Sequence, residues 1–185
     1  HEMPFRPRDY ARRLRVVFLG GDNYGPNAES LVEIERVARI LADTAPRLPI
    51  VFEAAGAVTR DLGLRHVRRL GFVPDLADLF SEDAVLLAPV RSGTGVKTKV
   101  LDAMAHSVPV LTTSLGTEGL AVEPESEIVV RDRVEDLAAS LIRFAGHETG
   151  RLASVARGGW GYATRLHLRP DVRRTFLSQI GGAAA

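Results

Sequence analysis

The chain of 185 residues has 24 lysine and arginine residues against 23 aspartate and glutamate residues, which leaves a net charge of +1. This length predicts one globular domain, and 45% hydrophobic residues are enough for a core without disulfides or metals. The small net charge and the scattered arginines argue against a nucleic-acid-binding protein, and the absence of cysteine excludes disulfides and thiol chemistry.

Histidine spacing, the length of apolar runs and the first residues narrow the class of protein further. The five histidines are not spaced like metal ligands, so no metal site is predicted. No apolar run approaches the roughly 18 residues of a membrane-spanning helix. The first residues do not resemble a natural N-terminus. We interpret 1–14 as a leader or linker, 15–180 as the core, and 1–185 as one domain cut from a longer chain.

The first predicted elements are a strand and a helix. Residues 15–21 (RVVFLGG) are apolar and β-branched and end in two glycines, which is typical of a buried strand that runs into a turn. The next segment has apolar residues at helical spacing. Asn27 is predicted to be the N-cap, Ser30 and Glu33 to form a capping box, and Pro46 to stop the helix.

The alternation of strand and helix continues along the chain. Further strands are predicted in residues 48–56, 66–73, 83–90, 108–114 and 127–132. Helices are predicted in residues 74–82, 95–106 and 133–146, with a short helix or turn near Asp61 and a mostly helical tail to about Ile180.

Six short apolar strands separated by helices predict an α/β fold: a doubly wound, Rossmann-like parallel sheet of about six strands. Ligands of such sheets bind beyond the C-terminal ends of the strands. The site is therefore expected in the turns after Gly20, Phe72, Pro89 and Thr113.

The only two lysines of the chain, Lys97 and Lys99, lie in one glycine-rich stretch, residues 91–104 (RSGTGVKTKVLDAM). Gly93 and Gly95 permit a sharp turn, and the helix that follows presents unpaired N–H groups. Each lysine near a helix start costs about 0.3–1 kcal/mol unless an anion compensates. The pattern favours a bound anion, held by compact point charges, over the alternative of solvated residues in an ordinary turn.

Helical spacing adds a second group to this predicted anion site. Gly95, Lys99 and Asp102 fall on one side of the helix, away from its apolar stripe. A phosphate joined to a hydroxyl-bearing group, such as a ribose accepted by Asp102, would use all three. Val96 and Thr98 stand where a Walker A loop and a dinucleotide motif would need glycine, so neither an ATPase nor a dehydrogenase is predicted.

Two segments, GFVPDLADLF (71–80) and LLAPVRSGTGVKTKVLDAMAHSVPVLTTSLGTEGL (86–120), resemble the C-terminal domain of group 1, family 4-like, retaining glycosyltransferases of GT-B architecture. The resemblance extends from Arg15 to about Phe144. In that family this domain holds a nucleotide-diphosphate sugar, and an N-terminal domain holds the acceptor. The resemblance implies a donor-binding domain that needs the missing N-terminal domain for catalysis, and no metal or cofactor.

The resemblance also places the donor diphosphate on the glycine loop. Lys97 would be its main stabiliser, and Lys99 would be shared between the phosphate and Asp102. The arginine and lysine that many members carry after the first strand have no counterpart in GGDNYGPN (residues 20–27). The backbone N–H groups that would contact the diphosphate belong to Gly95, Val96, Lys97 and Thr98.

The nucleoside and the sugar would use further positions. The family's paired glutamates align with Thr94 and Asp102; Asp102 would accept the ribose hydroxyls, whereas Thr94 lacks the carboxylate that usually contacts the donor sugar. Glu118 would bond sugar hydroxyls or cap the following turn. The remaining predicted donor-binding residues are Arg91 and Gly93 in the loop, Gly21 after the first strand, Val73 at the base edge, and Gly116 beside Glu118.

Other interpretations stay open. A non-catalytic interaction domain of the same fold would explain Thr94 and the first loop, and a sugar-nucleotide epimerase would share the architecture. Trp160 is predicted to pack or to contact the missing domain. The expected location is the cytoplasm, with any contact to the inner face of the membrane made through the missing part.

Overall fold

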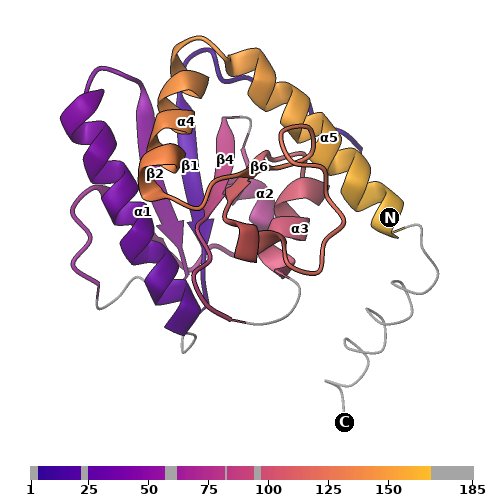
Figure 1. The fold of residues 1–185 in the computed structure, drawn as a ribbon, viewed down its shortest axis with the longest axis horizontal. Helices are drawn as coiled ribbons and strands as arrows, with labels where there is room; N and C mark the ends of the chain where they lie inside the picture. The colour runs from indigo at the N-terminus through magenta and orange to yellow at the C-terminus, as the bar shows by residue number, and fades with distance from the viewer. Residues whose placement is uncertain (1–3, 22–24, 57–61, 82, 94–96, 168–185) are drawn as a thin grey trace.

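The structure of the protein, a computed structural model, describes residues 4–21, 25–56, 62–81, 83–93 and 97–167 (Figure 1). Its centre is a six-stranded sheet in the order β3-β2-β1-β4-β5-β6, and every neighbouring pair is parallel. This confirms the predicted fold class. The strands are β1 (Leu14–Leu19), β2 (Ile50–Ala55), β3 (Val67–Gly71), β4 (Ala84–Ala88), β5 (Val110–Thr112) and β6 (Val129–Val130).

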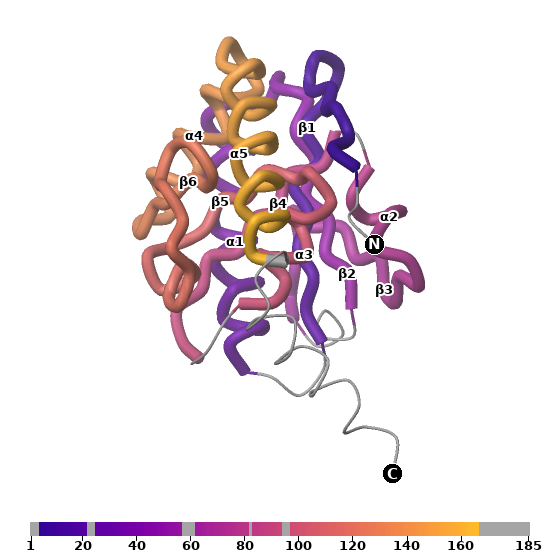
Figure 2. Tube along the Cα trace, turned by 90° about the vertical axis from the view of Figure 1, so that its right-hand side faces the viewer, coloured from indigo at the N-terminus to yellow at the C-terminus, as the bar shows by residue number. Residues whose placement is uncertain are grey.

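Helices cover both faces of the sheet: α1 and α4 pack on one face, and α3 packs on the other with the second half of α5 (Figures 1 and 2). The chain adds β2 and β3 on one side of β1 and then β4 to β6 on the other, so the order reverses between β1 and β4. The helices are α1 (Gly25–Thr44), α2 (Leu76–Leu79), α3 (Thr98–Ala105), α4 (Val134–Gly146) and α5 (Thr149–His167), with a 3-10 turn, η2, at Ser114–Thr117.

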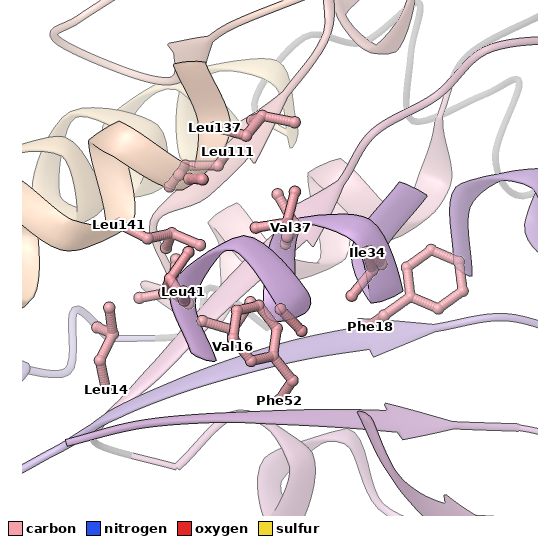
Figure 3. Packing of buried hydrophobic residues seen from close by; sticks show 14 of the residues in the cluster. Leu14, Val16, Phe18, Ile34, Val37, Leu41, Phe52, Leu111, Leu137 and Leu141 are labelled. Carbon is pink, nitrogen blue, oxygen red and sulfur yellow. The ribbon is translucent and has the colours of Figure 1, made fainter. Parts of the chain in front are cut away.

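Two apolar clusters hold these layers together. One joins β1 to α1 and α4, where Val16, Val37 and Leu141 pack with their neighbours (Figure 3). The other joins the opposite face of β4 and β5 to α3 and to the second half of α5, through Leu86, Met104 and other buried side chains. Both faces of the sheet are therefore buried at β4, whose five residues are all inaccessible to solvent.

The sheet is polar at one place. On the face of α3, Arg15 of β1 and Arg68 of β3 each form a salt bridge with Glu53 of β2, at 2.5 and 2.8 Å. The side chain of Arg68 is 72% exposed, and Val51 of β2 is also exposed. Among the described residues, charged side chains rather than a helix therefore cover this part of β2 and β3.

Residues 4–13, predicted to be a leader or linker, pack against the domain. Arg8 donates hydrogen bonds to the carbonyl oxygens of Ser107 and Phe80, both at 2.8 Å, and to those of Ser81 and His106. The ring of Phe5 lies edge-on to Trp160, with centroids 5.6 Å apart. Trp160 is therefore a packing residue, which was one of the two roles predicted for it. We call residues 4–10 the N-terminal strap; it ties the C-terminal end of α3 to α5.

Two helix starts differ from the prediction. α1 begins at Gly25, so Asn27 lies inside its first turn, and its prediction as N-cap was wrong. Pro26 suits the first turn because it needs no N–H partner there, and Ser30 Oγ donates to Pro26 O at 2.9 Å instead of capping with Glu33. α3 begins at Thr98, three residues later than predicted, with Lys97 as its N-cap residue. The predicted turn near Asp61 and the tail beyond His167 lie outside the described residues.

Candidate functional site

A cleft of about 360 Å³ opens beyond the C-terminal ends of β1 and β4. The ribbon in Figure 1 has these strand ends at the lower edge of the sheet. These are the two strands between which the sheet order reverses, the usual place for a ligand in this kind of fold. Five of the predicted donor-binding residues line the cleft: Gly21, Lys97, Thr98, Lys99 and Asp102. Six lining residues were not predicted: Leu19, Pro26, Asn27, Ser30, Val90 and Ser92.

Lys99 is the most constrained charged group of the cleft. Its ammonium donates a hydrogen bond of 2.6 Å to Asn27 Oδ1 and lies 4.3 Å from the centroid of the Phe18 ring. Among the described residues it forms no salt bridge with a carboxylate. Burial lowers the pKa of Lys99 from 10.5 to about 8. Among the residues that the structure describes, the partners of this ammonium are thus an amide oxygen and an aromatic ring.

Lys97 is held differently, by the glycine loop itself. Its ammonium donates a 3.0 Å hydrogen bond to the carbonyl oxygen of Gly93, whose φ of 96° belongs to the region that favours glycine. As the N-cap residue of α3, Lys97 supplies no side-chain acceptor. The first N–H groups of an α-helix have no partner within the helix, so this end of α3 offers donors to a ligand.

Asp102 lies one turn further along α3 and lines the same cleft. The position i+3 places it beside Lys99 on the helix surface, as the helical spacing predicted. Lys99 and Asp102 therefore lie together at one cleft, and a ligand with both an anionic and a hydroxyl group would meet a matching partner for each.

Arg91 is placed outside the cleft. Its Nε and Nη2 donate to Glu33 Oε2 on α1 at 2.9 and 2.7 Å, and its Nη1 donates to the carbonyl oxygen of Asp132 at 2.6 Å. Asp132 in turn accepts hydrogen bonds from Ser114, which lower the pKa of its carboxyl group. The Arg91 guanidinium therefore links α1 to the segment after β6, and its contact with a donor stays a prediction.

The other predicted donor-binding residues that the structure describes do not line the cleft. Val73 follows β3 and is partly buried. Gly116 is buried in η2, where a Cβ atom would come within 1.9 Å of Thr112 Oγ1, whereas Glu118 is exposed at the end of that turn. The positions of Thr94, Gly95 and Val96 lie outside the described residues.

A second hollow, of about 460 Å³, lies where β2 and β3 begin, beside the end of α1. Its lining is mainly apolar, and its charged residues are already paired: Arg13 with Asp83, and Arg68 with Glu53. We place the site in the smaller cleft because two lysines line it, and neither forms a salt bridge among the described residues.

Neither a metal centre nor a membrane span emerges from the described part of the chain. No group of three or more histidine, aspartate or glutamate side chains is gathered there in a way that could hold a metal ion. None of the helices described is both long and apolar enough to cross a membrane.

Comparison with known sequences gives a family for most of the chain. Residues 13–147 match the family model described as glycosyl transferases group 1. A Klebsiella pneumoniae protein, described as an uncharacterized 44.6 kDa protein in the cps region, is 28% identical over 76 residues, which are 41% of this chain and 20% of that protein.

Solved structures share the fold at low sequence identity. S. aureus TarM has a TM-score of 0.72 at 13% identity, over 96% of this chain and 36% of TarM. Anabaena Alr3699/HepE, solved in complex with UDP-glucose, has a TM-score of 0.68 at 16% identity, over 91% of this chain and 50% of that one. The C-terminal domain of the group 1 family protein LpcC from Francisella tularensis has a TM-score of 0.64 at 14% identity, over 82% of this chain and 85% of that one. The chain thus spans half or less of the Klebsiella protein, TarM and HepE.

Proposed function

Because residues 13–147 place this chain in the group 1 glycosyl transferase family, we propose that its cleft binds a nucleotide-diphosphate sugar and that the domain serves as the donor half of a glycosyltransferase. The observation that carries the proposal is the ammonium of Lys99, held at the cleft by a neutral amide and an aromatic ring. A diphosphate is the kind of ligand that supplies the missing negative charge.

Each part of such a donor would have a partner: the diphosphate and the ribose at the cleft, and the base near the end of β3. The diphosphate would lie between Lys97, Lys99 and the first N–H groups of α3, where the helix dipole also favours an anion. Asp102 would accept hydrogen bonds from the ribose, and the backbone near Val73 would meet the base. The relative with bound UDP-glucose supports this kind of ligand for the shared fold.

The contribution to catalysis would be electrostatic. When the bond between the sugar and the diphosphate breaks, negative charge grows on the leaving phosphate oxygen, and fixed cations and N–H donors stabilise it. This needs no metal ion. The acceptor, a further domain that binds it, retention of configuration and a cytoplasmic location are parts of the same proposal.

A second candidate is an interaction domain that keeps the fold without donor binding. It is favoured by the position of Arg91, which contacts Glu33 and Asp132 instead of the cleft. The two candidates differ in a simple property, since only the first predicts saturable binding of a nucleoside diphosphate.

Isothermal titration calorimetry with UDP, ADP, GDP and inorganic pyrophosphate separates the candidates. At least one nucleoside diphosphate should bind saturably, and Lys97→Ala should weaken it about tenfold, the usual value of a charged hydrogen bond. Asp102→Ala should weaken the nucleotide but not pyrophosphate, because Asp102 is assigned to the ribose. Asp43→Ala, on the exposed end of α1, is the control. Absence of saturable binding of all four compounds would leave the interaction domain as the answer.

A further inference from the structure

Asn27 occupies an unusual place for a polar side chain. It lies in the first turn of α1, is only 8% exposed, and contacts a residue 72 positions later in the chain. Its Nδ2 donates to the carbonyl oxygen of Gly21 at 3.2 Å, and its Oδ1 accepts from Lys99 Nζ at 2.6 Å. The amide therefore joins the loop after β1 to the helix that carries both lysines.

These two contacts fix the orientation of the amide. A carbonyl oxygen can only accept, so it requires the NH₂ group of Asn27, and an ammonium can only donate, so it requires the amide oxygen. Turning the amide over would set oxygen against oxygen and NH₂ against ammonium. The Gly21 carbonyl thus ensures that the Lys99 ammonium faces an acceptor.

The acceptor of Lys99 is neutral, unlike the partners of three partly buried arginines of the described chain. Arg15, Arg91 and Arg131 each face a carboxylate, on Glu53, Glu33 and Glu125 respectively. A carboxylate at the position of Asn27 would neutralise the ammonium and repel an anionic ligand. An amide oxygen orients the ammonium and leaves its charge available.

Further charged groups of the described residues lie on the elements around this contact. Lys97 and Asp102 line the same cleft from α3, Lys97 being bonded to Gly93 O. On α1, Glu29 accepts a 2.5 Å hydrogen bond from Ser92 Oγ. The ring of Phe18, 1% exposed, lies against Lys99 from β1.

We propose that Asn27 is a positioning residue of the anion site: its amide holds the Lys99 ammonium at the cleft while leaving the lysine charge free to bind the phosphate of a ligand. In this role Asn27 acts through Lys99 and does not itself contact the sugar donor or the acceptor substrate. The inference rests on the proposed function, because it takes the ligand to be a nucleoside diphosphate.

Two substitutions of nearly equal shape test the role. Asn27→Asp places a carboxylate beside Lys99, and Asn27→Leu removes the acceptor. Because the chain has only two lysines, labelling lysine side chains with 13C at Cε gives two NMR signals, and Lys99→Arg identifies the one from Lys99. Its titration is followed without ligand, and UDP binding is measured by calorimetry on the same samples.

The expected results have a distinctive pattern. The titration midpoint of Lys99 rises by at least about 1 pH unit in Asn27→Asp, because an opposite charge favours the ammonium, and falls in Asn27→Leu, because a partner of the ammonium is lost. UDP affinity falls about tenfold in both. Ala28→Asp, which adds the same charge one residue later on α1, should change UDP affinity less than about threefold.

The opposing outcomes are separable. A Lys99 midpoint that stays unchanged, or moves in the same direction in both variants, overturns the positioning role, since a merely structural residue would not move it in opposite directions. Opposite midpoint shifts with unchanged UDP affinity overturn the inference and leave donor binding intact. If the unmodified chain binds none of UDP, ADP and GDP while the midpoints shift oppositely, the proposed function and its phosphate ligand fail, and the Asn27–Lys99 contact stands.

Discussion

The C-terminal end of α3 is held by residues from distant parts of the chain, whereas its N-terminal end is held mainly through its two lysines. At the C-terminal end, Arg8 of the N-terminal strap bonds the carbonyl oxygens of His106 and Ser107, and Ser107 Oγ accepts from the backbone of Arg6. At the N-terminal end, Lys97 supplies no side-chain cap. A helix fixed at one end can thus present its other end to a ligand that completes the capping.

Removing the Arg8 side chain from the N-terminal strap should give the largest expected effect. It should lower the stability of the fold without changing ligand binding. Arg8→Ala leaves partly buried carbonyl oxygens without a donor and should lower the free energy of unfolding by about 2–4 kcal/mol, measured by urea denaturation. UDP affinity should stay within about twofold of the unmodified chain. Arg12→Ala, on an exposed side chain, is the control. A large loss of UDP affinity in Arg8→Ala would show that the two ends of α3 are not independent.

The opposite pattern is expected at the other end. Lys99→Ala should weaken UDP binding about 10- to 100-fold, which corresponds to about 1.5–3 kcal/mol for a charged hydrogen bond. The free energy of unfolding should not fall, because the substitution removes a charge from a partly buried position. Calorimetry and urea denaturation of the same sample measure both values. Equal UDP affinity in the variant would contradict the assignment of Lys99.

The pH dependence of binding sharpens the same contrast. Burial lowers the pKa of Lys99 to about 8, so the ammonium is mostly present at pH 7 and mostly lost at pH 9. UDP is already fully ionised in this range, since the second phosphate pKa is about 6. Affinity should therefore fall by up to about tenfold from pH 7 to pH 9. In Lys99→Ala this slope should disappear, and its persistence would implicate another group.

The smallest expected effect concerns two backbone positions that flank α3. Gly93 has a φ of 96° and Ser107 has a φ of 60°. The position of Gly93 therefore requires glycine more strictly than the position of Ser107 does. Gly93→Ala should cost about 1 kcal/mol of stability and weaken UDP binding, because the Lys97 contact with Gly93 is disturbed. Ser107→Gly relieves the positive φ but removes the buried hydroxyl that accepts from the backbone of Arg6, so it should cost at most about 1 kcal/mol and leave binding unchanged. Denaturation curves and calorimetry compare the pair.

The sequence predicts the sheet well because its strands are short apolar runs between clear helical patterns. Each of the six strands overlaps a segment predicted to be a strand, and the glycine loop with its two lysines marks the strand end at which the cleft opens. Local physics decides these features. The start of α3 is a local error of the prediction: propensity places it three residues before Thr98, where the helix begins.

The contacts across the cleft could not be predicted from the sequence. Asn27 has the residue type of a helix N-cap, and only the fold reveals that its partner is Lys99, 72 residues away. In the same way, Arg91 follows a strand at the predicted site, but its guanidinium donates to the carboxylate of Glu33 on α1 instead of lining the cleft. Pairings between distant segments depend on packing that no local pattern records.

The charged face shared by β2 and β3 has a consequence for local unfolding. β4 is buried along its whole length, whereas β3 is an edge strand in which two of five residues are exposed. Free energies of local opening follow burial, so amide hydrogens of β3 should exchange with solvent well before those of β4. The loop with Val73 continues from β3, and the loop with Gly93 follows β4. A bound nucleotide would then have its base on the least protected strand and its diphosphate on the most protected one.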